Sequence, residues 1–297
     1  MFKGLSAFPL TPLVNDDIDE AAFIRLLTRL VSADVDSLGV LGSTGSYAYL
    51  TREQRKRVTV MAKAHAGNIP IMTSIGAIST AEVLHLAEDA QTAGAKALLL
   101  PVMSYQPLAD DEVYSLYKDV SANVSVPVCI YDNPRCTHFR FSEDLLCRIA
   151  ALPHISAIKL PGGPTDTGGI AERVQRLRAQ VPEHVALGVS ADAFAADGLN
   201  AGCDVWFSVC GGLFPRTAKA ISDAAARQDK QQVIELSERF KPLWALFAKH
   251  GGGIRVTAAA AALLGLATPD CLPRPLKALG RDDIAEIAAV IRESRLE

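Results

Sequence analysis

Residues 155–161 have the sequence ISAIKLP, an apolar run of strand length that carries one lysine near its end. Apolar side chains occupy both alternations of the run, which is typical of a parallel strand covered by helices on both faces. Such strands occur almost only in α/β proteins. The run therefore predicts an α/β fold, and its lysine is the feature that this fold alone does not explain.

Seven similar apolar runs share the chain with this one, and segments with helix-type spacing lie between them. Eight βα units in succession predict a closed (β/α)₈ barrel, the TIM barrel. A doubly wound sheet is the alternative, but its first strand is usually followed by a glycine fingerprint, whereas the first run here leads into FPLTP. The eight runs are GLSAF (4–8), SLGVLGS (37–43), PIMTSIG (70–76), ALLLPV (97–102), PVCIYDN (127–133), ISAIKLP (155–161), VALGVS (185–190) and DVWFSVC (204–210).

Several helices are marked by residues that favour helix ends. Thr51, Ser79 and Ser142 each precede a helical segment, and their side chains suit the N-cap position. Asp192 is expected to open the helix that follows the seventh strand. Gly94 is expected at the C′ position, where glycine tolerates the left-handed backbone.

The length of 297 residues exceeds what a barrel alone needs. We expect a catalytic (β/α)₈ barrel over residues 1–228 and a helical extension over residues 229–297. Helices are predicted within the extension at 230–249, 255–265 and 281–295. We expect the extension to pack on the barrel and to help build an oligomer.

Composition limits the classes of function and the cell compartment. The net charge is −3 and the pI about 6.1, which argues against nucleic acid as a partner. The six cysteines form no CxxC pair, and no apolar stretch is long enough for a membrane span or a signal peptide. The six histidines form no HxH or HExxH motif, which disfavours a zinc site. We expect a cytoplasmic enzyme with no metal and no cofactor, and no membrane partner.

Lys159 is the first candidate for catalysis. We expect it to be the penultimate residue of the sixth strand and to share a face with Ile155 and Ala157. The ends of barrel strands form the active-site mouth, and burial there disfavours the charged ammonium. A neutral amine attacks a carbonyl and forms a Schiff base. The alternative is a lysine whose ammonium group reaches water.

Hydroxyl groups follow three other strands at the same mouth. Ser43 and Thr44 lie between two glycines in GVLGSTGSY (39–47), a turn that suits a small carboxylate, although an ordinary βα turn needs such glycines too. Tyr131 follows strand five and could move protons beside an imine, or its ring could simply pack the barrel top. Tyr105, after strand four, could extend a proton relay through a hydroxyl to water.

Three motifs in this order resemble the dihydrodipicolinate synthase / N-acetylneuraminate lyase family. They are Gly42-Ser43-Thr44-Gly45 after strand two, Tyr131-Asp132-Asn133-Pro134 after strand five, and Lys159 at the end of strand six. The segments AFPLTPL (7–13) and RPLKALG (274–280) also fit, so the resemblance covers the whole chain. It implies a (β/α)₈ barrel with a C-terminal helical extension and class I lyase chemistry on pyruvate or another 2-keto acid.

The resemblance also implies a role for each candidate residue. Lys159 would form the imine, Tyr131 would be the general acid/base, and Tyr105 would complete a relay, often from a neighbouring subunit of a homotetramer; a homodimer is the other assembly we expect. The substrate-binding residues would be Ser43, Thr44, Ser190 and Phe207, with Thr44 also passing protons. The partners would be pyruvate and an aldehyde, or the adduct of the two.

Departures from the family pattern concern the second substrate. Ser46 replaces the usual glutamate of the strand-two turn, and Ser190 stands where glycine is usual. Cys136 occupies the position of the arginine that binds the aldehyde's carboxylate, and Arg135 lies one place earlier. We therefore expect a second substrate other than aspartate semialdehyde. The alternatives are a 2-keto-3-deoxy sugar acid aldolase or dehydratase, and a catalytically idle keto-acid-binding homologue.

Overall fold

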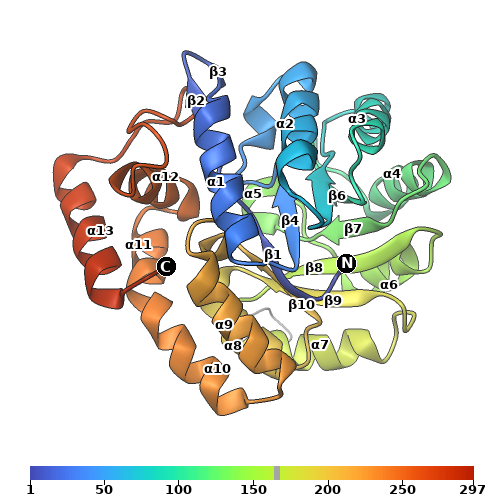
Figure 1. Ribbon diagram of the computed structural model, residues 1–297. Coiled ribbons are helices and arrows are strands. Elements are labelled where there is room, and N and C mark those ends of the chain that lie inside the picture. The colour runs from blue at the N-terminus through green and yellow to red at the C-terminus, as the bar shows by residue number, and fades with distance from the viewer. Residues whose placement is uncertain (164–167) are drawn as a thin grey trace.

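The structure is a computed structural model that describes residues 1–163 and 168–297. Across these residues, eight parallel strands close into a barrel in the order β1-β10-β9-β8-β7-β6-β5-β4 (Figure 1). Each strand falls within one of the eight predicted runs, so the predicted barrel is confirmed. The barrel strands are β1 (Gly4–Ala7), β4 (Ser37–Val40), β5 (Ile71–Ser74), β6 (Ala97–Pro101), β7 (Val128–Tyr131), β8 (Ile155–Pro161), β9 (Ala186–Ser190) and β10 (Val205–Ser208), and a hairpin consists of β2 (Leu13–Val14) and β3 (Asp17–Ile18).

Helices surround the barrel and cover the outer faces of its strands (Figure 1). The α-helices of this layer are α1 (Glu20–Ser32), α2 (Arg52–His65), α3 (Thr80–Thr92), α4 (Asp110–Ala122), α6 (Glu143–Ala150), α7 (Ile170–Arg178), α8 (Ala195–Asn200) and α9 (Pro215–Ala226), whereas the short α5 (Pro134–Thr137) follows directly after β7. Short 3₁₀ helices are η1 (Tyr47–Tyr49), η2 (Asp192–Phe194), η3 (Cys210–Gly212) and η4 (Glu238–Phe240).

The predicted helix ends are confirmed with one exception. Thr51, Ser79 and Ser142 each accept a hydrogen bond from the backbone of the third residue after them, and Gly94 has a φ of 95° after α3. Asp192 was expected to open a helix but begins only the 3₁₀ turn η2. Its carboxylate instead accepts hydrogen bonds from Trp206 Nε1 at 2.9 Å and from the backbone N–H of Cys210 at 2.7 Å. These bonds fix the loop after β10 to the loop after β9.

The barrel interior and the layer between barrel and helices are two separate apolar clusters. The interior holds Ala157 together with Tyr131 and Phe207, whereas Ile158 and Leu160 face the helices. Ile155 also faces the helices, contrary to the expectation that it shares a face with Lys159. The pairing of β7 with β8 shifts by one residue between Val128 and Cys129, and such a bulge reverses the alternation of all residues before it.

The helical extension packs against the end of the barrel, beside α1 and α9 (Figure 1). Its helices are α10 (Lys230–Ser237), α11 (Lys241–Lys249), α12 (Gly253–Leu263) and α13 (Arg281–Ser294). Phe240 stacks on Trp244 at 5.8 Å between ring centroids and meets the edge of Trp206 in β10 at 6.5 Å. The boundary at residue 228 lies between α9 and α10 and stays a prediction.

Two further observations concern the cysteines and the helices. All six cysteines are free thiols, in keeping with the absence of any CxxC pair. Among the described residues, no helix has both the length and the apolar character that crossing a bilayer requires.

Candidate active site

Lys159 lies inside the barrel near the carboxyl ends of the strands. β8 continues through Pro161, so Lys159 is two residues from its end rather than penultimate, and it pairs with Tyr131 of β7 and Gly188 of β9. Its side chain is 4% exposed. Within the described part of the chain, no carboxylate lies at ion-pair distance from Nζ. Among the described residues, the amine therefore has no counter-charge.

Three aromatic rings surround this amine. Nζ lies 4.1 Å from the ring centroids of Phe8 and Tyr131 and 5.7 Å from that of Phe207. Phe8 and Phe207 meet edge to face at 6.0 Å. Gly188 leaves room for this arrangement, because a Cβ there would lie 2.3 Å from the Phe207 ring. The rings keep water away from the amine, and their faces can attract its cationic form.

The phenol of Tyr131 lies between an amide and a hydroxyl. Asn133 Nδ2 donates to Tyr131 Oη at 2.8 Å, and Ser43 Oγ is 3.4 Å from the same oxygen. Because the amide occupies one lone pair as a donor, the phenolic proton is left to point toward Ser43 or toward a substrate. The two hydroxyls therefore lie at the limit of hydrogen-bond distance from each other.

The turn after β4 brings Ser43 and Thr44 to the mouth of the barrel. The backbone is tight there: a Cβ on Gly45 would lie 2.9 Å from Leu41 N, and one on Gly42 would lie 2.6 Å from the Phe8 ring. Thr44 is buried and Ser43 is half-buried. The two glycines are therefore required by close packing, and the turn places the Ser43 hydroxyl beside Tyr131.

Ser190 and Phe207 line the same end of the barrel. Ser190 Oγ donates to the backbone carbonyl of Leu160 at 2.9 Å, which ties the end of β9 to β8 directly after Lys159. The Phe207 ring forms part of the wall around the lysine amine. Both predicted lining residues thus belong to the neighbourhood of Lys159.

Tyr105 is apart from this group in the single chain. Its side chain is 87% exposed in the loop between β6 and α4, and it has no hydrogen bond to any described residue. A relay from Tyr131 to Tyr105 is therefore not formed within one copy of the chain. Its predicted role depends on a second copy.

Three features of the site were missed by sequence reasoning. Phe8 lies just beyond β1 and was not recognised as a wall of the site, although its alternation with Ala7 indicates an inward side chain. Asn133 was not predicted to donate a hydrogen bond to Tyr131. The buried ion pair between Asp132 and Arg173, 2.8 Å apart, had no sequence signal because the partners are 41 residues apart.

This ion pair supports the end of β7. The backbone N–H of Asp132 donates to the carbonyl of Lys159 at 3.1 Å, and Asp132 Oδ2 accepts from Arg173 of α7. Both side chains are nearly inaccessible. Burial raises the pKa of the Asp132 carboxyl, and the neighbouring Arg173 guanidinium opposes that rise. The pair holds the strand ends that carry Tyr131 and Lys159.

Replacing Arg173 with Met is expected to lower the free energy of unfolding by about 3 kcal/mol at pH 7, because it leaves a buried charge uncompensated. The loss should shrink as the pH falls, since protonation of Asp132 removes that charge. Urea unfolding at several pH values measures this. The matched double variant D132N/R173M should recover much of the loss; a double variant no more stable than R173M would contradict the argument.

The sequence profile of the Dihydrodipicolinate synthetase family matches residues 1–294. The chain belongs to this family. A 4-hydroxy-tetrahydrodipicolinate synthase of Rhodospirillum centenum is 30% identical over 276 residues, which is 91% of each protein. One from Phenylobacterium zucineum is 34% identical over 160 residues, which is 54% of each protein. The crystal structure of dihydrodipicolinate synthase from Agrobacterium tumefaciens str. C58 superposes with a TM-score of 0.93 at 42% identity, covering 98% of this chain and 97% of that one.

At two positions where the sequence departs from the dihydrodipicolinate synthetase pattern, the structure shows how the side chains are placed. Ser46 has a left-handed backbone with a φ of 62°, and its hydroxyl is buried with no hydrogen-bond partner among the described residues. Arg135 Nη2 donates to the carbonyl of Gly251 at 2.5 Å, in the loop between α11 and α12. The Arg135 guanidinium is thus held by the extension, while Cys136 beside it is exposed.

Proposed function

We propose that the chain is a lyase of the class I aldolase type that forms a Schiff base between Lys159 and pyruvate or a related 2-keto acid. The observation that supports it is the buried amine of Lys159 in contact with the Tyr131 ring, whose hydroxyl neighbours Ser43. The chemistry needs an amine next to a proton donor and acceptor, and this arrangement places Lys159 Nζ beside the Tyr131 ring.

The proposed reaction begins when Nζ of Lys159 adds to the C2 carbonyl of the keto acid. Tyr131 gives its proton to the oxygen, a proton from the amine nitrogen follows, and water leaves a protonated imine. The Tyr131 phenolate then takes a C3 proton, and the resulting enamine attacks the aldehyde carbon while Tyr131 returns the proton to the aldehyde oxygen. Water finally hydrolyses the imine, which releases the adduct and restores Lys159 and Tyr131. The reverse sequence cleaves an adduct into pyruvate and an aldehyde.

The remaining residues are proposed to bind the substrate. The hydroxyls of Ser43 and Thr44 and the N–H groups of their turn would hold the keto-acid carboxylate. Ser190 and Phe207 would line the pocket, with the Phe207 ring excluding water from the imine. A water-poor site strengthens each of these polar contacts.

The second substrate is proposed to differ from aspartate semialdehyde. Cys136 has no charge with which to bind a second carboxylate, and Arg135 is engaged by Gly251. His138 and Arg140 are exposed just beyond α5 and could contact a longer substrate. A 2-keto-3-deoxy sugar acid is therefore the second candidate, either cleaved or dehydrated; product analysis distinguishes pyruvate plus an aldehyde from a dehydrated acid.

Borohydride reduction in the presence of pyruvate should attach a stable carboxyethyl group to Lys159, because reduction of an imine gives a secondary amine. Mass spectrometry of the digested protein locates the modified residue. The Lys159→Arg variant serves as the control and should remain unmodified. Modification of another lysine instead, or no modification at saturating pyruvate, would rule out the proposed intermediate.

A dimer or tetramer is proposed because Tyr105 is far more exposed than its proposed role allows. Tyr49 and Ile78, 47% and 68% exposed, lie in the loops after β4 and β5, near the Tyr105 loop after β6. Exposed apolar side chains grouped on neighbouring loops favour an interface. A second copy packed there would bring its own Tyr105 toward the first copy's Ser43 and Tyr131.

Mixed oligomers test this arrangement. Tyr105→Phe alone should reduce kcat about 10- to 100-fold through loss of a proton relay. Co-assembly of Lys159→Ala chains with Tyr105→Phe chains should restore part of the activity, because some sites then have an intact lysine and an intact partner tyrosine. Lys159→Ala mixed with Tyr131→Phe is the matched control, and it should restore none. Equal recovery in both mixtures would contradict a tyrosine supplied by the partner.

A further inference from the structure

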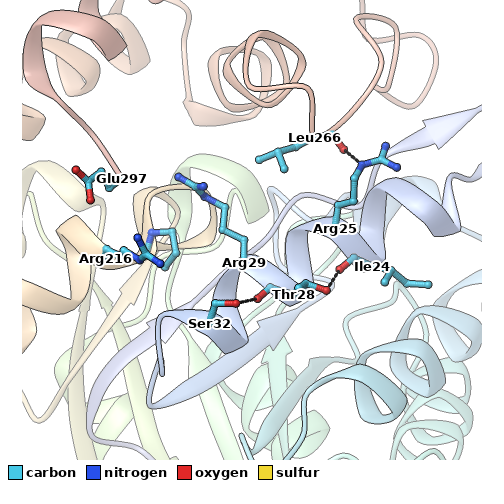
Figure 2. Close-up of a pocket in the computed structure, with 9 residues that line it drawn as sticks. Ile24, Arg25, Thr28, Arg29, Ser32, Arg216, Leu266 and Glu297 are labelled. Carbon is cyan, nitrogen blue, oxygen red and sulfur yellow. Dashed lines mark hydrogen bonds between the residues drawn. The ribbon is translucent and has the colours of Figure 1, made fainter.

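A cavity lies outside the barrel, on the outer side of α1. It has a volume of about 510 Å³ and lies between α1, the first turn of α9 and the residue Glu297 (Figure 2). Three arginines, Arg25, Arg29 and Arg216, contribute to its lining, and none of the residues assigned to the candidate active site does. Its volume lies within the usual range of small-molecule sites, about 300–1,000 Å³.

Two of the arginines are each held by a hydrogen bond from Nε to a backbone carbonyl. Arg29 Nε donates to the carbonyl of Leu213 at 2.7 Å, and Arg25 Nε donates to the carbonyl of Leu266 at 3.3 Å. The terminal nitrogens of both guanidinium groups have no hydrogen-bond acceptor among the described residues. Each arginine thus presents the part of its side chain that binds carboxylate or phosphate in a two-pronged manner.

Positive charge in the cavity is only partly balanced. Arg25 and Arg29 are one turn apart on the same helix face, an arrangement of like charges that disfavours the helix. Glu297 is the one carboxylate side chain in the cavity lining, and it forms no ion pair with any of the three arginines in the described structure. Burial, together with the charge of Arg216, lowers the pKa of the Arg29 guanidinium, and Glu297 opposes this only in part.

We propose that this cavity binds a small organic anion with at least two carboxylate or phosphate groups. Arg29 and Arg216 would hold one anionic group, and Arg25, farther along α1 (Figure 2), would hold another. A ligand with separated charges fits this layout better than a single inorganic ion, because the arginines are spread along the cavity. The site is independent of Lys159, so the proposal stands or falls apart from the proposed activity.

Binding of citrate and of fructose 1,6-bisphosphate, each with at least two anionic groups, to the full chain tests the proposal, by calorimetry and by thermal unfolding at constant ionic strength in chloride. We expect saturable binding of at least one of the two, with a rise in Tm that chloride alone does not give. The double variant R29Q/R216Q should bind at least about tenfold more weakly. The difference between the two ligands tells polycarboxylates from phosphate esters.

A control variant that loses the same amount of positive charge elsewhere distinguishes a specific site from general electrostatic attraction. R227Q/R281Q removes two exposed arginines outside the cavity and should bind as the unmodified chain does. Should R29Q/R216Q fail to fold, Arg216→Gln alone replaces it, because Arg216 is exposed and has no hydrogen bond in the described structure. Absence of saturable binding, or equal weakening in R227Q/R281Q, would overturn the proposal.

Discussion

Lys159→Ala is expected to lower kcat/KM by at least about 10⁴-fold for any reaction that passes through the imine, since no other group replaces a lost nucleophile. The barrel should still fold. Truncation removes three amine–ring contacts, each worth about 0.5–2 kcal/mol, but also removes the cost of keeping a polar amine away from water. Steady-state assays with pyruvate and a panel of aldehydes measure the rate, and urea unfolding measures the stability.

Lys159→Arg is the companion variant, because it keeps a cation at the same place but cannot form a Schiff base. It should be as inactive as Lys159→Ala. Substantial activity in either variant would mean that the lysine only fills space and attracts anions. Inactivity together with a large loss of stability would also count against the proposed role of Lys159, because unfolding would then explain the missing activity.

Tyr131→Phe is expected to lower kcat about 10²- to 10⁴-fold with little change in KM, the range typical of a lost general acid/base. The ring and its contact with Lys159 Nζ remain in this variant, so binding should be preserved. Borohydride trapping should still label Lys159, but more slowly. Equal decreases in affinity and in rate would assign the hydroxyl to substrate binding instead.

Tyr117→Phe is a matched control for this substitution. Tyr117 is also fully buried, and its hydroxyl donates to the carbonyl of Leu100 at 2.6 Å on the outer side of the barrel. Its loss should cost about 1 kcal/mol of stability and leave kcat unchanged. A similar fall in kcat for both variants would point to general loosening of the barrel rather than to proton transfer at Tyr131.

Much of the fold could be predicted from local patterns, and one error shows their limit. The apolar run at 155–161 was assigned to the correct strand, yet Ile155 was placed on the wrong face. A β-bulge depends on how two strands pair, and nothing within the run itself indicates it. The same holds for Asp192, which suits a helix start by residue type but is turned inward by Trp206 and Cys210.

In the candidate site too, local patterns predicted some residues, whereas others were revealed only by tertiary contacts. Lys159, Tyr131, Ser43 and Thr44 could be selected because barrel strands all direct their carboxyl ends to one face. Phe8 and the Asp132–Arg173 pair were missed, since each acts through a partner distant in the chain. Tyr105 was selected as well, but one chain leaves it in solvent.

The sequence by itself determined the order of strands and helices and which residues stand at the strand ends, because side-chain periodicity and turn chemistry are local properties. Only the tertiary structure decided how closely Lys159, Phe8 and Tyr131 approach one another and that Arg135 is held by Gly251. It also gathered Arg25, Arg29 and Arg216 into one cavity. Distances between residues far apart in the chain follow from barrel closure and packing, and no local pattern contains them.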